Sequence, residues 1–408
     1  MKKQKNIPKL RFPEFEGEWE KKKLGDIGDI VTGSTPPTAN NSYYNGEFLF
    51  VSPADIQDSR YVTNTITTLT QDGFLKGRMI PSGSIMFVCI GSTIGKVAQA
   101  KKECITNQQI NAVLPINNNN DFVFSLLEYH SNNIKLLSAV QAVPIINKTT
   151  FANYNLCIPN LPEQQKIASF FTAIDQKISQ LKRKLTLLEL YKKGVMQKIF
   201  SQEIRFKDEN GQEFPKWEKK RLGDIGKTYN GLTGKSKDDF GQGKPYIQYK
   251  QIFDDTKIDI TRFDFVNIKD GEKQSRVKYG DVFFTTSSET PDEVGTSSVL
   301  LDEVNEVYLN SFCFGYRCSQ VVLLPQFSRY LFRNESFRNK VNTLAQGSTR
   351  YNMSKNELMK LEITLPAISE QTKIANFLSA IDDKIIHTQK QIEKAEVWKK
   401  GLMQQMFV

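Results

Sequence analysis

Histidine and cysteine, the residues that most often bind transition metals or act as nucleophiles, are scarce in this chain. Only two histidines, His130 and His387, occur among 408 residues, and the five cysteines form no C-x-x-C pair. A structural zinc site needs four such ligands at short spacings, so no metal site is expected. The odd number and scattered spacing of the cysteines predict free thiols in a reducing compartment.

Long apolar runs are also missing. No stretch approaches the roughly 18 consecutive apolar residues that cross a bilayer. The basic residues 1–11 are not followed by an apolar segment of signal-peptide length. The sequence therefore predicts a cytoplasmic protein without a membrane partner.

Motifs that would give the chain an active site of its own are incomplete. Residues 91–97 are one residue too short for a phosphate-binding loop and end in valine, and residues 231–236 are two residues too short. Residues 291–293 (Pro-Asp-Glu) lack the Glu-x-Lys that would complete a nuclease motif. We therefore expect no catalytic residue in this chain.

Acidic residues are outnumbered by basic ones. The 55 Lys and Arg against 45 Asp and Glu give a formal net charge of +10, which favours a polyanionic partner without identifying it. Hydrophobic residues make up 39% of the chain, enough for real cores, and 408 residues suggest two or three domains.

The chain contains one pattern twice. Residues 19–28 (WEKKKLGDIG) recur as residues 217–226 (WEKKRLGDIG), and each copy follows a Phe-Pro pair. A longer segment, residues 163–200, aligns without a gap onto residues 370–407. Between these landmarks the two halves have little in common. Duplication followed by divergence of the middle parts explains this order.

The two longer matching segments are predicted to be amphipathic helices with a heptad pattern. Mostly apolar residues recur at the first and fourth heptad positions over four repeats, without an internal proline; the exceptions are Lys192, Thr388 and Lys399. At about 1.5 Å per residue, a helix of about 38 residues spans roughly 57 Å. The predicted seam consists of Phe171, Ile174, Ile178, Leu181, Leu185 and Leu188 in the first helix and Leu378, Ile381, Ile385 and Ile392 in the second.

Two arrangements fit this pattern. The helices could form an intramolecular antiparallel coiled coil that acts as a fixed-length spacer, or each could pack on its own domain. The length of the pattern favours the spacer, with the variable blocks at opposite ends and the C-terminus near the N-terminal block. Lys192 and Lys399 share one heptad position in the two copies and are expected to set register or end the seam.

The variable blocks contain short runs of β-branched and aromatic residues broken by Gly, Pro and Asn, as at 46–51, 84–88 and 281–285. These runs predict sheet-rich α/β (α+β) domains, with helices at 122–139 and 325–344. The expected order is a first block (1–161), a helix (162–200), a tether (201–214), a second block (215–368) and a second helix (369–408).

The whole arrangement resembles the specificity subunit of type I restriction–modification systems. The resemblance rests on the repeated Trp-Glu-x-x-x-Leu-Gly-Asp-Ile motif, on Ile-Pro-x-Leu-Pro-Glu-Gln-Gln-Lys-Ile-Ala at the first long helix, and on the duplicated layout. It covers essentially the full chain. It implies that each block is a target-recognition domain that reads one half of a bipartite, asymmetric site in double-stranded DNA.

The resemblance also implies partners. The helices would set the gap between half-sites and dock two methyltransferase subunits, which bring S-adenosylmethionine and methylate adenine N6. Restriction subunits, with ATP and Mg, would join to cleave DNA. This chain itself is expected to bind no cofactor. The alternatives are a stand-alone DNA-binding regulator, a coiled-coil adaptor without a DNA role, and a self-sufficient methyltransferase, which the missing cofactor motif disfavours.

In the second block, the candidate DNA-reading residues are polar side chains on predicted loops, because donors and acceptors read base edges while Lys and Arg hold phosphates. Arg350 could bind guanine, and Asn352 or Gln346 could pair with adenine. The alternative is a polar turn before Ser354, which would cap a helix at 355–361. The candidates are Gln346, Ser348, Thr349, Arg350, Tyr351 and Asn352, together with Gln248, Tyr249 and Lys250.

In the first block, the corresponding candidates lie in three loop-like segments. The segment with Lys148 could touch phosphate, and a solvated turn is the alternative there. Basic residues also exceed acidic ones along the first helix, which usually marks a solvated face but could attract a DNA backbone. The candidates are Ser92, Thr93, Lys96, Asn107, Gln108 and Lys148.

Overall fold

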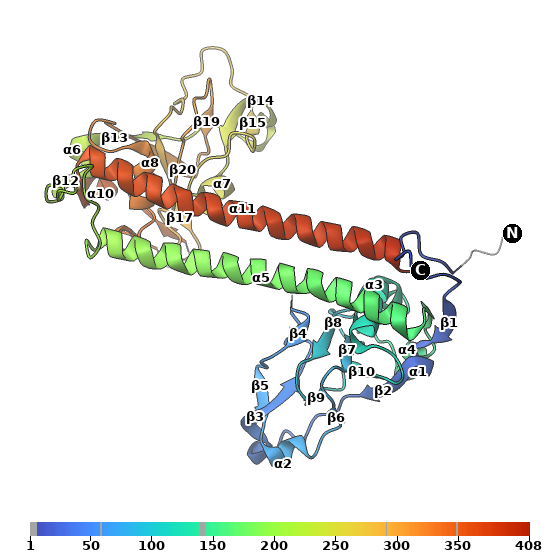
Figure 1. Ribbon diagram of the computed structural model, residues 1–408. Helices are drawn as coiled ribbons and strands as arrows, with labels where there is room; N and C mark the ends of the chain where they lie inside the picture. Colours follow the sequence, from blue (N-terminus) through green and yellow to red (C-terminus); the bar gives the residue numbers. More distant parts are fainter. Residues whose placement is uncertain (1–5, 58, 139–142, 291, 348–349) are drawn as a thin grey trace. The chain divides into compact units, whose positions relative to one another are not determined.

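The computed structural model describes residues 6–57, 59–138, 143–290, 292–347 and 350–408 (Figure 1). The chain forms two compact units, Met1–Leu185 with Thr388–Val408, and Thr186–His387. Unit 1 thus contains the first block, the beginning of the first long helix and the end of the second, and unit 2 contains the complementary parts. The predicted mixed α/β fold with an internal repeat is confirmed. None of the helices among the described residues is long and apolar enough to span a bilayer.

Unit 1 has two main sheets, with strand orders β2-β10-β7-β8-β4 and β5-β3-β9-β6, and a short pair β1-β11. The strands are β1 Glu20–Lys23, β2 Gly28–Thr32, β3 Tyr44–Val51, β4 Tyr61–Val62, β5 Thr67–Leu69, β6 Met79–Ile80, β7 Ile85–Val88, β8 Val97–Ala100, β9 Cys104–Thr106, β10 Ile110–Pro115 and β11 Asn155–Ile158. Its short helices are α1 Leu24–Ile27, η1 Asn41–Tyr43, α2 Gln71–Phe74, α3 Asn120–Lys135 and α4 Lys148–Ala152. The apolar strand β7 is buried along its whole length because it lies between β10 and β8 and under α3.

Unit 2 repeats the main sheet as β13-β20-β16-β18, beside a smaller sheet β15-β14-β19 and the pairs β12-β22 and β17-β21. The strands are β12 Glu218–Arg221, β13 Gly226–Asn230, β14 Phe240–Ile247, β15 Asp264–Val266, β16 Val282–Thr285, β17 Ser287–Ser288, β18 Ser297–Val299, β19 Tyr308–Leu309, β20 Cys313–Cys318, β21 Tyr351–Asn352 and β22 Glu362–Leu365. Its short helices are α6 Leu222–Ile225, η2 Lys237–Asp239, α7 Tyr249–Asp254, α8 Pro325–Leu331, α9 Glu335–Asn342 and α10 Lys355–Lys360. The three predicted strands correspond to β3, β7 and β16.

The prediction of one helix at 325–344 was wrong, because α8 ends at Leu331 and α9 begins at Glu335. The break lies at Asn334, whose side-chain oxygen accepts a hydrogen bond from the backbone N–H of Phe337 (3.0 Å) and caps α9. The helix predicted at 122–139 is α3, which begins after a similar cap at Asn119 and ends at Lys135. Residue 139 lies outside the described residues.

The long helices are α5 (Leu161–Phe200) and α11 (Ile368–Met406), and both continue through the glycines at 194 and 401. In unit 1, the seam residues Phe171, Ile174 and Ile178 belong to the core of the first block. The same core includes Met403 and Phe407 from the end of the chain. In this unit, therefore, one face of α5 packs both on the first block and on the end of α11.

Ion pairs show how the helix segments are oriented within unit 1. Asp175 pairs with Lys399 (2.8 Å), and Lys182, further along α5, pairs with Glu396, which comes earlier in α11 (2.7 Å). The segments are therefore antiparallel in this unit. In unit 2, Lys192 of α5 pairs with Asp382 of α11 (2.5 Å).

The remaining seam residues differ in burial. Leu181, Leu378, Ile381 and Ile392 are buried, whereas Leu185, Leu188 and Ile385 are half-buried. Lys192 and Lys399 make matching ion pairs to Asp382 and Asp175. That these lysines set register or end the seam stays a prediction. A coiled coil continuous over all four heptads stays a prediction.

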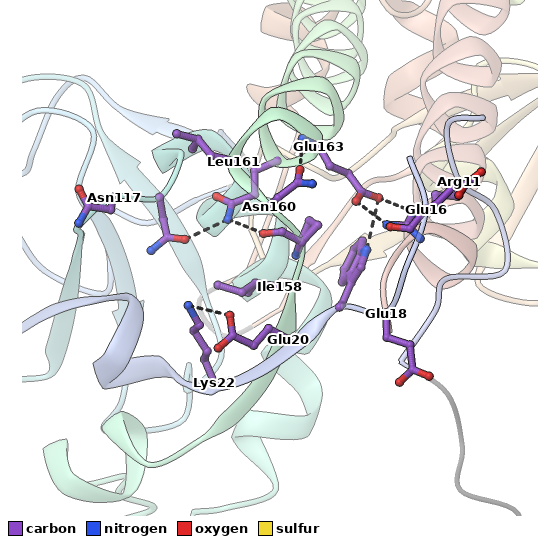
Figure 2. A pocket seen from close by; sticks show the side chains of 14 residues that line it. Arg11, Glu16, Glu18, Glu20, Lys22, Asn117, Ile158, Asn160, Leu161 and Glu163 are labelled. Carbon is purple, nitrogen blue, oxygen red and sulfur yellow. Dashed lines mark hydrogen bonds and ion pairs between the residues drawn. The ribbon is translucent and has the colours of Figure 1, made fainter. Parts of the chain in front are cut away.

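The repeated Trp-Glu motif fixes each block to the start of its long helix. In unit 1, the buried Glu163 carboxylate accepts two hydrogen bonds from the Arg11 guanidinium (2.8 and 2.7 Å) and one from Trp19 Nε1 (3.3 Å) (Figure 2). In unit 2, Glu370 accepts the corresponding bonds from Arg205 (3.2 and 2.6 Å) and from Trp217 (3.2 Å). The tryptophans and glutamates belong to the repeated segments of the sequence, whereas Arg11 and Arg205 lie outside them.

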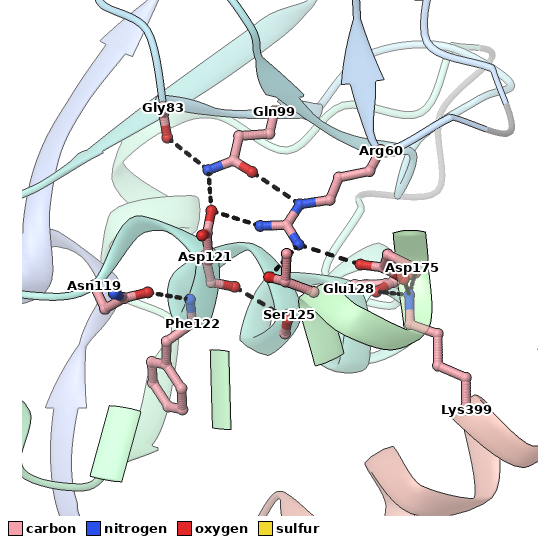
Figure 3. A network of polar contacts seen from close by, with 11 residues as sticks. Arg60, Gly83, Gln99, Asn119, Asp121, Phe122, Ser125, Glu128, Asp175 and Lys399 are labelled. Carbon is pink, nitrogen blue, oxygen red and sulfur yellow. Dashed lines mark hydrogen bonds and ion pairs between the residues drawn. The ribbon is translucent and has the colours of Figure 1, made fainter. Parts of the chain in front are cut away.

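A second polar network joins the first block to both long helices in unit 1 (Figure 3). Arg60 binds Asp121 of α3 (2.6 Å) and Asp175 of α5 (3.3 Å). Lys399 binds Glu128 (2.6 Å) as well as Asp175. Burial raises the pKa of Glu128, and Lys399 partly offsets this effect. Burial lowers the pKa of Lys399, but Glu128 and Asp175 outweigh it, so the lysine stays charged.

Candidate nucleic-acid interface

Three segments of unit 1 are joined by backbone hydrogen bonds at the end of β7: the loop that begins at Cys89, residues 107–109 and residues 143–147. This frame positions most of the candidates in unit 1. The backbone N–H of Cys89, just after β7, donates to the carbonyl of Gln109 (2.8 Å). The carbonyl of Cys89 accepts from the N–H of Ile146 (2.8 Å), and Ile90 forms a β-bridge with Ile145. Segments 107–109 and 143–147 therefore flank the loop that follows β7.

The same frame recurs at the end of β16 in unit 2. Thr286 donates to the carbonyl of Phe312 (2.9 Å) and accepts from the N–H of Met353 (2.9 Å). Ser287 and Ser288 then pair with Asn352 and Tyr351 as the strands β17 and β21. Hydrogen bonding thus makes Phe312 equivalent to Gln109 and Asn352 equivalent to Ile145, although the local sequences do not match.

Two candidates of the first block have structural partners. The Lys96 ammonium donates to the backbone carbonyl of Ile56 (2.9 Å), so it is held within the domain. The Asn107 side chain donates to Gln109 Oε1 (2.9 Å) and accepts from the Gln109 N–H (3.1 Å), which holds the 107–109 turn. Lys96 and Asn107 thus have partners within unit 1, and that they also contact DNA stays a prediction.

The other candidates of the first block lie at its surface. Ser92 and Gln108 are exposed and Thr93 is half-buried. Gln108 accepts a hydrogen bond from the Thr35 hydroxyl (2.5 Å), which brings the 33–38 loop to the same edge. Lys148 is exposed at the first position of α4.

Two candidates of the second block line one cavity of about 410 Å³. These are Tyr249 and Arg350, which share the cavity with Phe312. The Tyr249 hydroxyl donates to the carbonyl of Ser287 (2.8 Å), and burial raises its pKa, so the ring is fixed and neutral. The other lining residues are Phe253, Ser287, Ser288, Glu289 and Glu293.

The remaining candidates of the second block are close in sequence to Tyr249 and Arg350, which line this cavity. Gln346 and Asn352 exchange two backbone hydrogen bonds (3.0 and 2.8 Å), which closes the loop between them. Both are exposed, as is Lys250, whereas Gln248 and Tyr351 are half-buried. Ser348 and Thr349 lie outside the described residues. Ser354 is the N-cap residue of α10, and its side chain makes no capping hydrogen bond. The choice between a DNA contact and a polar turn before the helix stays open for these residues.

Sequence reasoning missed the apolar and acidic residues of these frames. Phe312 is 58% exposed and lines the cavity with Glu289 and Glu293, while Val143 and Ile145 are exposed beside the loop after β7. A search for polar residues on loops does not detect exposed apolar side chains. Their exposed fractions, the cavity lining and the hydrogen-bond equivalence of the two units reveal them.

The titratable groups inside the domains belong to the cores. All five cysteines are free, and burial raises the pKa of the Cys89 and Cys104 thiols to about 12. Burial lowers the pKa of His130 to about 4, and the Tyr154 hydroxyl lies 3.1 Å from its Nδ1. Within the described ranges, no three His, Cys, Asp or Glu residues lie close enough to hold a metal ion together.

A family model described as the type I restriction modification DNA specificity domain matches the chain twice, at residues 16–190 and 215–397. Each match contains one variable block, its sheet frame and a large part of the long helix that follows. Two such domains in one chain define a DNA-specificity protein of duplicated architecture. The chain belongs to the type I restriction–modification specificity subunit family.

Relatives and solved structures extend this result. The type I restriction enzyme MjaIX specificity subunit of Methanocaldococcus jannaschii is 28% identical over 273 residues, which is 61% of this chain and 61% of that relative. The MjaVIII specificity subunit of the same organism is 23% identical over 419 residues, 98% of this chain and 93% of the relative. The solved structure of the S subunit of a type I restriction-modification system from M. genitalium matches with a TM-score of 0.60 at 14% identity. The match covers 98% of this chain and 99% of that chain, and it concerns the fold alone.

Proposed function

We propose that this chain is the DNA-reading specificity subunit of a type I restriction–modification complex and that each unit reads one half of a bipartite, asymmetric target. The observation that carries this proposal is the recurrence of one backbone frame with different side chains. Gln109 and Ile145 in unit 1 correspond to Phe312 and Asn352 in unit 2. A backbone frame shared by the two units but carrying different side chains suits two readers with different targets.

The groups around each frame suit a duplex. Ser92, Thr93 and Gln108 offer donors and acceptors beside the exposed Lys148 in unit 1. Arg350 and Asn352 offer a bidentate donor and an amide in unit 2. Base edges would be read by these side chains, while the basic residues would bind phosphates and give salt-dependent affinity.

The long helices carry a feature that suits a partner present in two copies. Leu190 and Tyr191 of α5 are 60% and 54% exposed, and the corresponding residues of α11, Val397 and Trp398, are 73% and 54% exposed. An exposed aliphatic and aromatic pair at the same position of each repeat fits two copies of one partner. We propose that each pair docks one methyltransferase subunit, which would bring S-adenosylmethionine and methylate adenine N6.

Catalysis is assigned to the partners in this proposal. Restriction subunits with ATP and Mg would join the same complex to cleave DNA, and the helix pair of this chain would set the gap between the half-sites. The chain itself would contribute positioning and sequence choice.

The test uses the full chain expressed with its methyltransferase subunit, followed by genome-wide mapping of methylated adenines. Exchanging residues 215–368 for the block of another family member should change one half of the methylated target and leave the other half unchanged. The matched exchange of residues 30–155 should change the other half. An unchanged target in both exchanges would refute the proposal. Tight sequence-specific binding by the chain alone, without any dependence on the methyltransferase, would favour a stand-alone regulator.

A further inference from the structure

Exposed aliphatic side chains lie at the edge of the unit 1 frame, where the candidates identified from the sequence are all polar. Val143 is 52% exposed and Ile145 is 38% exposed, while the next residue, Ile146, is only 2% exposed. Ile145 forms a β-bridge with Ile90, so this short segment is extended. Because side chains alternate in an extended segment, the burial of Ile146 directs Ile145, and Val143 two residues earlier, to the opposite, outer side.

The backbone holds these two residues in place. Pro144, between them, accepts a hydrogen bond from the N–H of Gly91 (3.0 Å), and Ile146 donates to Cys89 (2.8 Å). Val143 and Ile145 are therefore presented by an ordered segment that is bonded on both sides of Ile145. Ordered presentation is what base reading requires, since a loose loop would lose conformational entropy on binding.

The equivalent positions in unit 2 are polar. Ile145 corresponds to Asn352, because Ile90 bridges Ile145 as Ser287 pairs with Asn352. Two residues earlier, Val143 corresponds to Arg350. The same backbone positions thus present two aliphatic side chains in one unit and a guanidinium and an amide in the other.

The surroundings of Val143 and Ile145 are those of a DNA-reading surface. The loop bonded to this segment carries the exposed Ser92, and Gln109, which is bonded to the same frame, is preceded by the exposed Gln108. The exposed Lys148 follows three residues after Ile145. Among the groups that base pairs present in the major groove, the C5-methyl of thymine is the apolar one.

We propose that Val143 and Ile145 read thymine methyl groups in the half-site of the first block. The half-site of the second block is read instead by hydrogen bonds from Arg350 and Asn352. This inference rests on the proposed function, because it requires that the first block reads DNA. It adds a chemical distinction between the half-sites, which is that only the first depends on methyl contacts.

The test replaces single thymines by uracil, which removes only the C5-methyl group and keeps every base pair. The protein is the full chain in complex with its methyltransferase subunit, and the block exchange assigns each half-site. Uracil at a contacted position of the first half-site should weaken binding about fourfold per methyl lost, the factor that corresponds to one buried methylene-sized group. Uracil in the second half-site should have no effect.

Variants identify the residues. In Val143→Ala and Ile145→Ala, the preference for thymine over uracil should fall toward one at the contacted positions. In the matched control Arg350→Ala, the preference in the first half-site should remain at its original value while binding at the second half-site weakens. The truncated side chains are exposed, so thermal unfolding should be unchanged.

Each outcome is decisive. Equal binding of thymine and uracil duplexes, or a first half-site without an A·T pair, would overturn the inference while leaving the bipartite function intact. Loss of affinity in Val143→Ala or Ile145→Ala with an unchanged thymine preference would also overturn it and would point to contact with another protein or to a wedge between bases. Failure of the complex to distinguish its methylated target from unrelated DNA would instead refute the proposed function.

Discussion

Replacing Lys399 by methionine should destabilise unit 1 selectively. The ammonium binds Glu128 (2.6 Å) and Asp175 (2.8 Å), and the lysine side chain is only 12% exposed. Removing one partner of a buried ion pair costs about 3–5 kcal/mol because a charge is left uncompensated. Glu128 is 36% exposed and Asp175 keeps Arg60, so we expect a smaller loss of about 2–3 kcal/mol.

The matched control is Lys192→Met in unit 2. Lys192 binds Asp382, but Asp382 also accepts from the Tyr330 hydroxyl (2.8 Å) and pairs with Arg329 (3.1 Å). Because two donors remain, this variant should lose less stability than Lys399→Met. Its loss should also appear in unit 2.

The effect of Lys399→Met should depend on pH. The pKa of Glu128 is raised in the folded protein, so its ionisation reduces stability as pH rises from the ordinary value of 4.5 through the folded pKa. Without Lys399, the pKa of Glu128 in the folded protein rises further, so unit 1 loses more stability at neutral pH. Lowering the pH toward the ordinary pKa of the carboxyl group should therefore reduce the difference between the variant and the parent chain.

Hydrogen exchange followed by mass spectrometry measures this prediction, because peptides report each unit separately. Faster exchange in Lys399→Met should be confined to residues 1–185 and 388–408, with a thermal midpoint lower by about 4–12 °C for that unit. Equal acceleration in both units, or a loss that does not change between neutral and mildly acidic pH, would refute the reasoning.

Three further predictions concern DNA and partners. Arg350→Ala should weaken one half-site by about 1–3 kcal/mol if the guanidinium contacts a base, and unchanged methylation at that half-site would remove it from the interface. Trp398→Glu and Tyr191→Glu should each weaken the docking of one methyltransferase subunit, and the double variant should bind no methyltransferase subunit. Analytical ultracentrifugation measures how many subunits each complex contains. Two bound subunits in the double variant would contradict the proposal. Inserting one heptad in both long helices adds about 10.5 Å, or about three base pairs. This insertion should lengthen only the gap between the half-sites of the mapped target. Altered half-sites would contradict the proposal that the helices set the gap.

The long helices were predictable because a heptad pattern over four repeats is a strong, local signal. The break between α8 and α9 was not, because apolar periodicity continues past Asn334 while its side chain caps a new helix. Strand positions such as β7 and β16 followed from short apolar runs. Their pairing into equivalent frames involves partners far away in the chain, which no local pattern specifies.

The candidate site was predictable only in part for the same reason. Arg350 and Tyr249 were identified as polar loop residues, and the fold brings them to one cavity. Lys96 has the same local character, but its ammonium bonds to Ile56, a distant residue whose proximity the sequence does not reveal. Val143 and Ile145 were overlooked because an exposed aliphatic residue and a core residue look alike in sequence.

Unit 1 is assembled from residues at both extremes of the chain, and this has a consequence for biosynthesis. Trp19 and Phe122 pack against Phe407, so their aromatic neighbour is translated long after them. Until residue 407 has been made, the first block keeps an unfilled apolar surface that is prone to chaperone binding or aggregation. A product terminated before Thr388 would therefore lack part of the core of unit 1 as well as the last part of α11.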